Sequence, residues 1–401
     1  MKVPMKVQPA KRTENITYAV RDVVVLADGI AATGKEMLYL NIGDPNLFDY
    51  RTPEHVIAAV VDAMKANHCG YGPSSGIPDA RRAIGAEAEA KGIRAIQDIF
   101  VTTGASEAID VALTALVNPG ENVLVPVPGY PLYGAILNKL GVQENPYYLD
   151  ESNGWQPDVA DIAAKVNDKT RAIVVINPNN PTGSLSDRRT LQAIMDIAAE
   201  RGLVVLTDEI YDKLIFDRRK YVSLASLSDD VPVVTFNGLS KAYLAPGFRI
   251  GWGIVSGPAE VVGEYIEAMN KLLRARLSAH HPGQYAIAPA LEGDHAHLGE
   301  VVAKLTRRRD MTVQMLNAID GIDCVSPGGA FYAFPRLHID RPDSEFAAEL
   351  VGETGVVVVP GSGFGQAPGT QHFRVVFLPS EEVLERAYRK IEAFLKKFKA
   401  G

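Results

Sequence analysis

The sequence predicts an α/β fold in which a mostly parallel β-sheet lies between layers of helices. Short apolar runs of strand length alternate with longer segments of helical period along most of the 401 residues. Residues 173–176 and 203–206 are apolar at every position. Both faces of such strands must be covered, as they are in a parallel sheet. A chain of this length holds roughly two to three domains and buries a large core.

The apolar runs and the helical segments define the individual elements. The expected strands are 100–102, 122–127, 172–176, 203–207, 231–236, 355–359 and 373–377. The expected helices are 106–117, 186–201, 259–277, 298–316 and 380–399. Ser186 or Asp187 can cap the helix 186–201, and Gly202 can end it. Pro282 and Gly283 fall between two long helices and predict a joint between domains.

The composition is that of an ordinary globular protein, with 47% hydrophobic and 22% charged residues. The net charge of −7 gives no electrostatic reason to expect binding to nucleic acid or to an anionic membrane. The longest apolar runs fall far short of the ~20 residues of a membrane helix. Cys69 and Cys324 are too few for a disulfide framework, and the histidines lack matched ligands, so we expect no metal site. We therefore expect a soluble, cytoplasmic enzyme.

Polar side chains and turn-forming residues follow consecutive predicted strands. These strand ends are 103–106, 128–131, 177–183, 208–211 and 237–241. In parallel α/β sheets, ligands bind beyond the carboxyl ends of the strands. We therefore expect these segments to face one crevice.

Lys241 and its neighbours predict a site for an aldehyde that carries a phosphate. A lysine in a partly apolar crevice has a lowered pKa and forms a Schiff base with an aldehyde. Arg249 follows a Pro-Gly turn that brings it back towards Lys241, and a guanidinium grips phosphate in a planar fork. Ser106 and Ser240 add hydroxyl donors, and the backbone N–H groups after Gly104 open a helix and attract an anion. Taken alone, a solvated lysine and a surface arginine are the commoner interpretation.

Further residues provide partners for an aromatic ring and for a carboxylate. Asp208 directly follows a buried strand, where an acid can keep a ring nitrogen protonated. Tyr211 and Asn180 can bind a phenolate oxygen, and Tyr130 can stack on the ring. Arg374 starts a buried strand and needs an anionic partner. Taken singly, a helix cap, a packed aromatic ring or an internal ion pair would also explain these residues, but together they match pyridoxal 5′-phosphate (PLP) and an amino acid.

The order of these residues resembles that of the class I PLP-dependent aminotransferases of fold type I. The resemblance is carried by the segments LNIGDP, YGPSSGIPDAR, TTGASEAI, PGYPLY, INPNNPTG, TDEIYDKL, FNGLSKAYLAPGFRIGW and HFRVVF, which lie between residues 40 and 377. Within the class, AVRDVV near the start, together with LNIGDP, INPNNPTG, DEIYDK and FNGLSK, is most similar to the alanine aminotransferase-like subgroup. This resemblance implies a mostly parallel sheet in a large PLP-binding domain, residues 45–281. It also implies a smaller α+β domain built from both chain ends, residues 1–44 and 282–401.

The resemblance also implies a role for each site residue. Lys241 forms the Schiff base and moves the proton between the substrate and the cofactor. The implied cofactor-binding residues are Ala105, Ser106, Tyr130, Asn180, Asp208, Tyr211, Ser240, Lys241 and Arg249, with Tyr71 from the other subunit of a homodimer. Arg374, Asn180 and the backbone at Gly43 take the substrate carboxylate. Two departures, Gly238 in place of a phosphate-binding serine and Tyr130 in place of tryptophan, argue against the aspartate-specific members.

The expected activity is transfer of the amino group of an L-amino acid, first of all alanine, to a 2-oxo acid such as 2-oxoglutarate. An aspartate-specific or broad aminotransferase, or a PLP-dependent carbon–sulfur β-lyase, remains as an alternative. Arg274 and Arg276 are candidates to bind the side chain of a dicarboxylate. A PLP-binding regulator is disfavoured because the first forty residues are too short for a DNA-binding domain. A nicotinamide dehydrogenase is disfavoured because Gln366 stands where the glycine fingerprint needs glycine.

Overall fold

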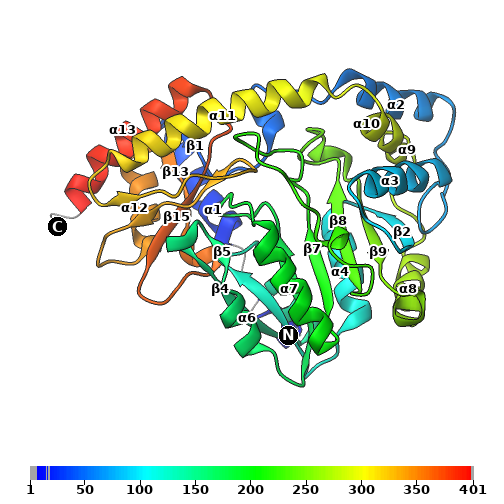
Figure 1. Cartoon of the computed structure of the whole chain (residues 1–401). Coiled ribbons are helices and arrows are strands. Elements are labelled where there is room, and N and C mark those ends of the chain that lie inside the picture. The colour runs from blue at the N-terminus through cyan, green and yellow to red at the C-terminus, as the bar shows by residue number, and fades with distance from the viewer. Residues whose placement is uncertain (1–6, 15, 17–18, 399–401) are drawn as a thin grey trace, which may run out of the picture.

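The computed structural model, which describes residues 7–14, 16 and 19–398, is built around an eight-stranded mixed sheet (Figure 1). Its strands, in spatial order, are β2 (Ile96–Thr102), β9 (Gly251–Ser256), β8 (Val233–Gly238), β7 (Val204–Asp208), β6 (Thr170–Ile176), β3 (Asn122–Val127), β4 (Gln143–Asp150) and β5 (Gln156–Pro157). The pairs β8–β7, β7–β6, β6–β3 and β3–β4 are parallel. β9 is antiparallel to both β2 and β8, so β2 and β8 point the same way.

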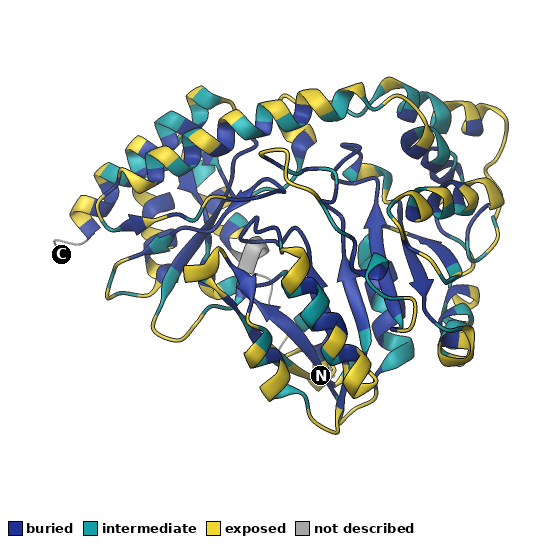
Figure 2. Ribbon diagram, viewed as in Figure 1, coloured by how far each residue is buried: buried dark blue, intermediate teal, exposed yellow. Residues whose placement is uncertain are grey.

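Helices cover both faces of this sheet, as the continuous apolar runs require. They are α3 (Pro78–Ala90), α4 (Ala105–Leu116), α5 (Leu132–Leu140), α6 (Val159–Lys165), α7 (Arg188–Arg201) and α8 (Ala259–Ala275), whereas α2 (Glu54–Lys65) makes its main contacts with other helices. In β6, Ile173 and Val175 pack in the core that holds the apolar side chains of α7, whereas Val174 and Ile176 pack in the core of α4, α5 and α8. Figure 2 accordingly shows dark blue, buried strands between helices whose outer faces are exposed.

The ends of α7 show how local sequence sets the boundaries of an element. The carboxylate of Asp187 accepts a hydrogen bond from the backbone N–H of Thr190 at 2.7 Å, so Asp187, of the two candidates, is the N-cap. Gly202 ends the helix in the left-handed conformation at φ 63°. Both positions were expected from the sequence.

Segments from the N-terminal and C-terminal portions of the chain lie together in a second part of the molecule (Figure 1). β1 (Leu38–Tyr39) pairs in parallel with β13 (Val356–Val357). A further sheet contains β10 (Ile322–Asp323), β12 (Arg336–Leu337), β15 (Gln371–Val376), β11 (Tyr332–Ala333) and β14 (Val359–Pro360). The helices of this part are α1 (Ala19–Ala31), α11 (Ala296–Asn317), α12 (Asp343–Thr354) and α13 (Glu381–Phe398).

One expectation about local structure is corrected. The predicted strand 355–359 is divided at Val358 into β13 and β14, which pair with different neighbours. Pro282 and Gly283, the predicted joint, lie in the short helix α9 (His281–Gln284), where proline at the first turn is tolerated. The next helix, α10 (Ile287–Glu292), packs against α2 and α3. The end of the predicted helix 380–399 at Lys399 lies outside the described residues.

No helix among the described residues combines the length and the hydrophobicity of a membrane span. Within the same part of the chain, no group of three or more His, Cys, Asp and Glu side chains is arranged to hold a metal ion.

Candidate active site

A cavity of about 520 Å³ lies at the carboxyl edge of the large sheet. Segments that follow β2, β3, β6, β7 and β8 all contribute to its wall, as the pattern of strand ends predicts. The predicted site residues that line it are Gly43, Ala105, Ser106, Tyr130, Asn180, Asp208, Tyr211, Ser240, Lys241, Arg249 and Arg374. Tyr71 does not line the cavity; 84% of its surface is exposed on the outside of the chain.

Lys241 follows β8 and points its amine into the cavity. Its Nζ donates a hydrogen bond to the carbonyl oxygen of Gly43 at 2.9 Å. Burial lowers the pKa of Lys241 to about 8; the positive charges of Arg374 and Arg249 act in the same direction, and Asp44 opposes them. A lysine with this pKa is partly neutral near pH 8, and the neutral amine is the form that attacks a carbonyl carbon.

Asp208 is the last residue of β7 and is 4% exposed. Burial raises its pKa to about 6, although a backbone hydrogen bond from Ile210 and a side-chain hydrogen bond from Tyr133 lower it. A buried carboxylate with a raised pKa gains stability from a cation placed beside it. The protonated nitrogen of a pyridine ring is a cation of suitable size for this position.

Tyr211 and Asn180 lie in the same wall. The hydroxyl oxygen of Tyr211 is 2.8 Å from that of Tyr332, and both tyrosines line the cavity. The side-chain oxygen of Asn180 accepts a hydrogen bond from Nη1 of Arg374 at 3.1 Å. Phenolic hydroxyl and amide groups are suitable donors for a ring oxygen.

The start of α4 and Arg249 form an anion-binding end of the cavity. Gly104 precedes α4 at φ 77°, and the first N–H groups of a helix are free to bind an anion. Arg249 adopts the left-handed conformation at φ 52° after the turn Pro246–Phe248, and its Nη1 donates to the carbonyl oxygen of Pro246 at 2.8 Å. A Cβ atom at Gly104 would lie 2.5 Å from Nη2 of Arg249, so the guanidinium rests against the helix N-terminus. The predicted return of Arg249 to this end of the cavity is therefore present.

Arg374 extends from β15 into the cavity and is 3% exposed. Its Nη2 donates to the carbonyl oxygen of Asn41 at 2.6 Å. The guanidinium carbon lies 4.7 Å from the ring centroids of both Tyr332 and Phe364. Contact with two aromatic rings restricts the guanidinium, whose planar shape can form two parallel hydrogen bonds to a carboxylate.

Sequence reasoning missed Tyr332, Phe364, Asn41 and Tyr133. Tyr332 and Phe364 read as ordinary core aromatics, because nothing local distinguishes them from the apolar residues around them. The other open candidates, Arg274 and Arg276, do not line the cavity. Arg274 pairs with Glu267 at 2.5 Å, and Arg276 pairs with Glu107 at 3.1 Å.

The glycine-rich segment 361–365 does not have the structure of a dinucleotide-binding turn. Gly361–Phe364 forms a 3₁₀ helix, and the next residues form a loop. A dinucleotide fingerprint requires an α-helix to open at this point, so the structure argues against the dehydrogenase alternative.

Comparisons with known proteins agree with this geometry. The sequence profile of the family "Aminotransferase class I and II" matches residues 35–391. The glutamate-pyruvate aminotransferase AlaA of Escherichia coli K12 is 36% identical over 97% of this chain and 98% of its own. The alanine aminotransferase of Mycobacterium tuberculosis H37Rv is 38% identical over 96% of this chain and 91% of its own. A solved alanine aminotransferase from Pyrococcus furiosus superposes with a TM-score of 0.94 at 41% identity, covering 97% of this chain and all of the other.

Proposed function

Because the chain belongs to the class I and II aminotransferases, we propose that it transfers the amino group of L-alanine to 2-oxoglutarate with PLP as cofactor. The observation that carries this proposal is one cavity that holds the amine of Lys241, the carboxylate of Asp208 and the guanidinium of Arg374. The relatives named for alanine or for glutamate and pyruvate support alanine as the donor.

The cavity offers a partner for each functional group of PLP. The amine of Lys241 suits the aldehyde, and the buried Asp208 suits the pyridine nitrogen, which would offset the cost of burying that acid. Tyr211 and Asn180 suit the phenolic oxygen, and Tyr130 the face of the ring. The phosphate suits the other end of the cavity, which holds Ala105, Ser106, Ser240 and Arg249.

The mechanism follows from what these side chains do. When bound, PLP supplies an aldehyde that captures the substrate amine and a ring that accepts electrons from the α-carbon. Arg374, with Asn180 beside it, holds the substrate α-carboxylate and so fixes the α-carbon. Lys241, whose pKa burial lowers to about 8, would take the proton from the substrate α-carbon and deliver it to the carbon of the cofactor's aldehyde group, two atoms away. Asp208 keeps a proton on the ring nitrogen throughout.

The residues that line the cavity favour a substrate with a small, uncharged side chain. Val24, Ile42 and Leu47 contribute apolar surface. Among the described lining residues, the cations are Lys241, Arg249 and Arg374, and each already has a role above.

The proposal also covers the oligomeric state of the protein and its location in the cell. We infer a cytoplasmic homodimer in which Tyr71 of each chain reaches the phosphate site of the other. Tyr71 is exposed and does not line the cavity of its own chain, so its hydroxyl is available to a second chain, which supports this arrangement. The division into residues 45–281 and residues 1–44 with 282–401 also remains a prediction.

A panel of amino donors with 2-oxoglutarate tests the function. L-Alanine is expected to give pyruvate and glutamate in equal amounts, and to be used more efficiently than L-aspartate. Ammonia and pyruvate from cystathionine, without glutamate from alanine, would instead establish a β-lyase. The Lys241→Ala variant is the control, because neither reaction proceeds without this amine.

A further inference from the structure

Two segments that are far apart in the sequence, 40–50 and 371–381, lie together around Arg374; we call them the clamp segments. Arg374 belongs to the second segment and donates to the carbonyl oxygen of Asn41 in the first. The backbone N–H of Val376 donates to the carbonyl oxygen of Leu40 at 2.8 Å. The direction of the Arg374 guanidinium therefore depends on how these two segments are placed relative to each other.

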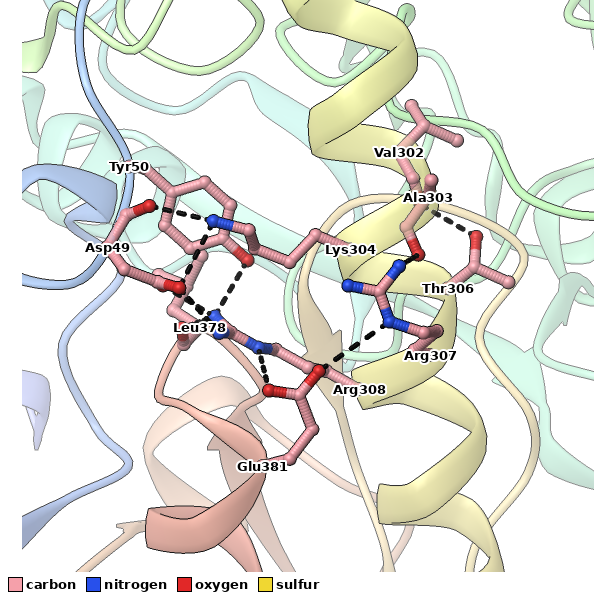
Figure 3. Close-up of polar contacts among 10 residues, drawn as sticks. All are labelled: Asp49, Tyr50, Val302, Ala303, Lys304, Thr306, Arg307, Arg308, Leu378 and Glu381. Carbon is pink, nitrogen blue, oxygen red and sulfur yellow. Dashed lines mark hydrogen bonds and ion pairs between the residues drawn. The ribbon is translucent and has the colours of Figure 1, made fainter.

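Arg308 of α11 contacts both segments and is 2% exposed (Figure 3). Its Nη1 and Nη2 donate to the two carboxylate oxygens of Asp49, both at 2.8 Å. Nη1 also donates to the hydroxyl of Tyr50 at 3.2 Å and to the carbonyl oxygen of Leu378, two residues after β15. Nε donates to Glu381 at 3.3 Å, at the start of α13. A single buried guanidinium thus joins the end of one segment to the end of the other.

Lys304 strengthens the same junction from one turn earlier on α11. Its Nζ donates to the backbone oxygen of Asp49 at 2.8 Å and to the carboxylate at 3.1 Å, and it lies 4.7 Å from the ring centroid of Tyr50 (Figure 3). Hydrogen bonding from Arg308 lowers the pKa of Asp49 to about 2, with further help from Lys304, although burial opposes it. The carboxylate is therefore ionised at any pH at which the enzyme would work.

We propose that Arg308 is a positioning residue for the substrate-carboxylate site, acting through Asp49 and Leu378 to hold Arg374 in its binding orientation. A planar fork with several fixed acceptors determines position and direction together, which a lysine cannot do. The inference rests on the proposed function in one respect, the role of Arg374 in binding the substrate carboxylate.

Arg309, the next residue of α11, is a matched control. It is 4% exposed and donates through Nη1 and Nη2 to the two carboxylate oxygens of Asp217 at 2.8 and 2.7 Å. Nη1 also donates to the carbonyl oxygen of Pro327 at 3.0 Å. Arg309 therefore shares the helix, the burial and the bidentate ion pair of Arg308, but its partners lie outside both clamp segments.

The test compares Arg308→Lys, Arg308→Gln and Asp49→Asn with Arg309→Lys and Arg309→Gln in the PLP-loaded enzyme. For each variant, kcat, KM for L-alanine, the dissociation constant for L-alanine from a spectral titration, and the melting temperature are measured. We expect Arg308→Gln and Asp49→Asn to raise KM and the dissociation constant about 10-fold with kcat within about 3-fold, since ground-state binding is what weakens. Arg308→Lys should give a KM and a dissociation constant between those of Arg308→Gln and those of the native enzyme.

The Arg309 variants should lower the melting temperature by about as much as the Arg308 variants do, and should leave KM for L-alanine unchanged. Equal KM values in the two sets would overturn the proposal, and if Arg308→Gln does not fold, the milder Arg308→Lys and Asp49→Asn decide it.

A double substitution separates this inference from the function on which it rests. If Arg308 acts through Arg374, then Arg308→Gln should change KM by less than about 2-fold when Arg374 is already lysine, because coupled sites are not additive. A full 10-fold effect in that background would show an independent, structural role and contradict the inference. If Arg374→Lys alone leaves KM unchanged, the carboxylate assignment of the proposed function is at fault instead.

Discussion

At the scale of single residues, burial shifts the two central groups of the site in opposite directions. The pKa of Lys241 falls to about 8, whereas the pKa of Asp208 rises to about 6. Both shifts have the same cause, because a buried environment disfavours the charged form of either group. The lowered pKa of Lys241 suits proton transfer at moderate pH, whereas the raised pKa of Asp208 reflects a buried carboxylate that a cation beside it would stabilise.

The capture of PLP by the cofactor-free enzyme should depend on pH through Lys241. The neutral amine reacts, so the rate should rise about tenfold per pH unit at low pH and level off above a midpoint near pH 8. Stopped-flow absorbance of the bound cofactor measures this rate, and Lys241→Ala should show no such phase. A midpoint near the ordinary lysine pKa of 10.5 would contradict the buried environment described for this amine.

At the scale of elements, the phosphate end of the cavity depends on how closely α4 and β9 approach each other. A Cβ atom at Gly251, the first residue of β9, would lie 2.2 Å from the backbone nitrogen of Ala105, so only glycine permits this contact. Gly104 has the same importance for Arg249, whose guanidinium occupies the space of the missing side chain.

Gly104→Ala should therefore weaken PLP binding by displacing Arg249. Gly141→Ala is the control, because Gly141 has a similar φ of 68° and nothing within 4 Å of an added Cβ atom. Each substitution should cost about 1 kcal/mol of stability from its backbone conformation. Only Gly104→Ala should also raise the dissociation constant for PLP, by about 10-fold, in an equilibrium titration of the cofactor-free enzyme. Equal PLP affinities in the two variants would show that the contact with Arg249 does not matter.

Elements with strong local signals could be predicted from the sequence. The continuous apolar runs identified β6 and β7, and Asp187 and Gly202 bounded α7 within two residues. The division of 355–359 into β13 and β14 could not be predicted, because it is set by pairing with β1 and β15 elsewhere in the chain. The same limit applies to Tyr332 and Phe364, which the tertiary fold brings beside Arg374.

At the scale of the whole molecule, the cavity combines residues from the eight-stranded sheet, from the sheet that contains β15 and from the N-terminal part of the chain. Asp208 ends β7, Lys241 follows β8, Arg374 lies in β15, and Gly43 precedes the 3₁₀ helix Pro45–Leu47. Segments separated by hundreds of residues must therefore fold together before the substrate site is complete. This explains why family motifs are spread over nearly the whole chain.

The predicted homodimer should share its two sites. The mass in solution should be twice the 43.3 kDa of the chain, as measured by analytical ultracentrifugation. Tyr71→Phe should weaken PLP binding about 10-fold through the loss of one hydrogen bond to phosphate, without changing the mass. Tyr39→Phe, which lies in β1 and does not line the cavity, is the control. A fully active monomer would contradict the shared site.

The most direct measurement is reduction of the PLP-loaded enzyme with borohydride, followed by mass spectrometry of its peptides. The amine at position 241 should carry the reduced cofactor in nearly every chain, and prior addition of L-alanine with no acceptor should protect it. A cofactor attached to a different lysine, or to none, would contradict the account.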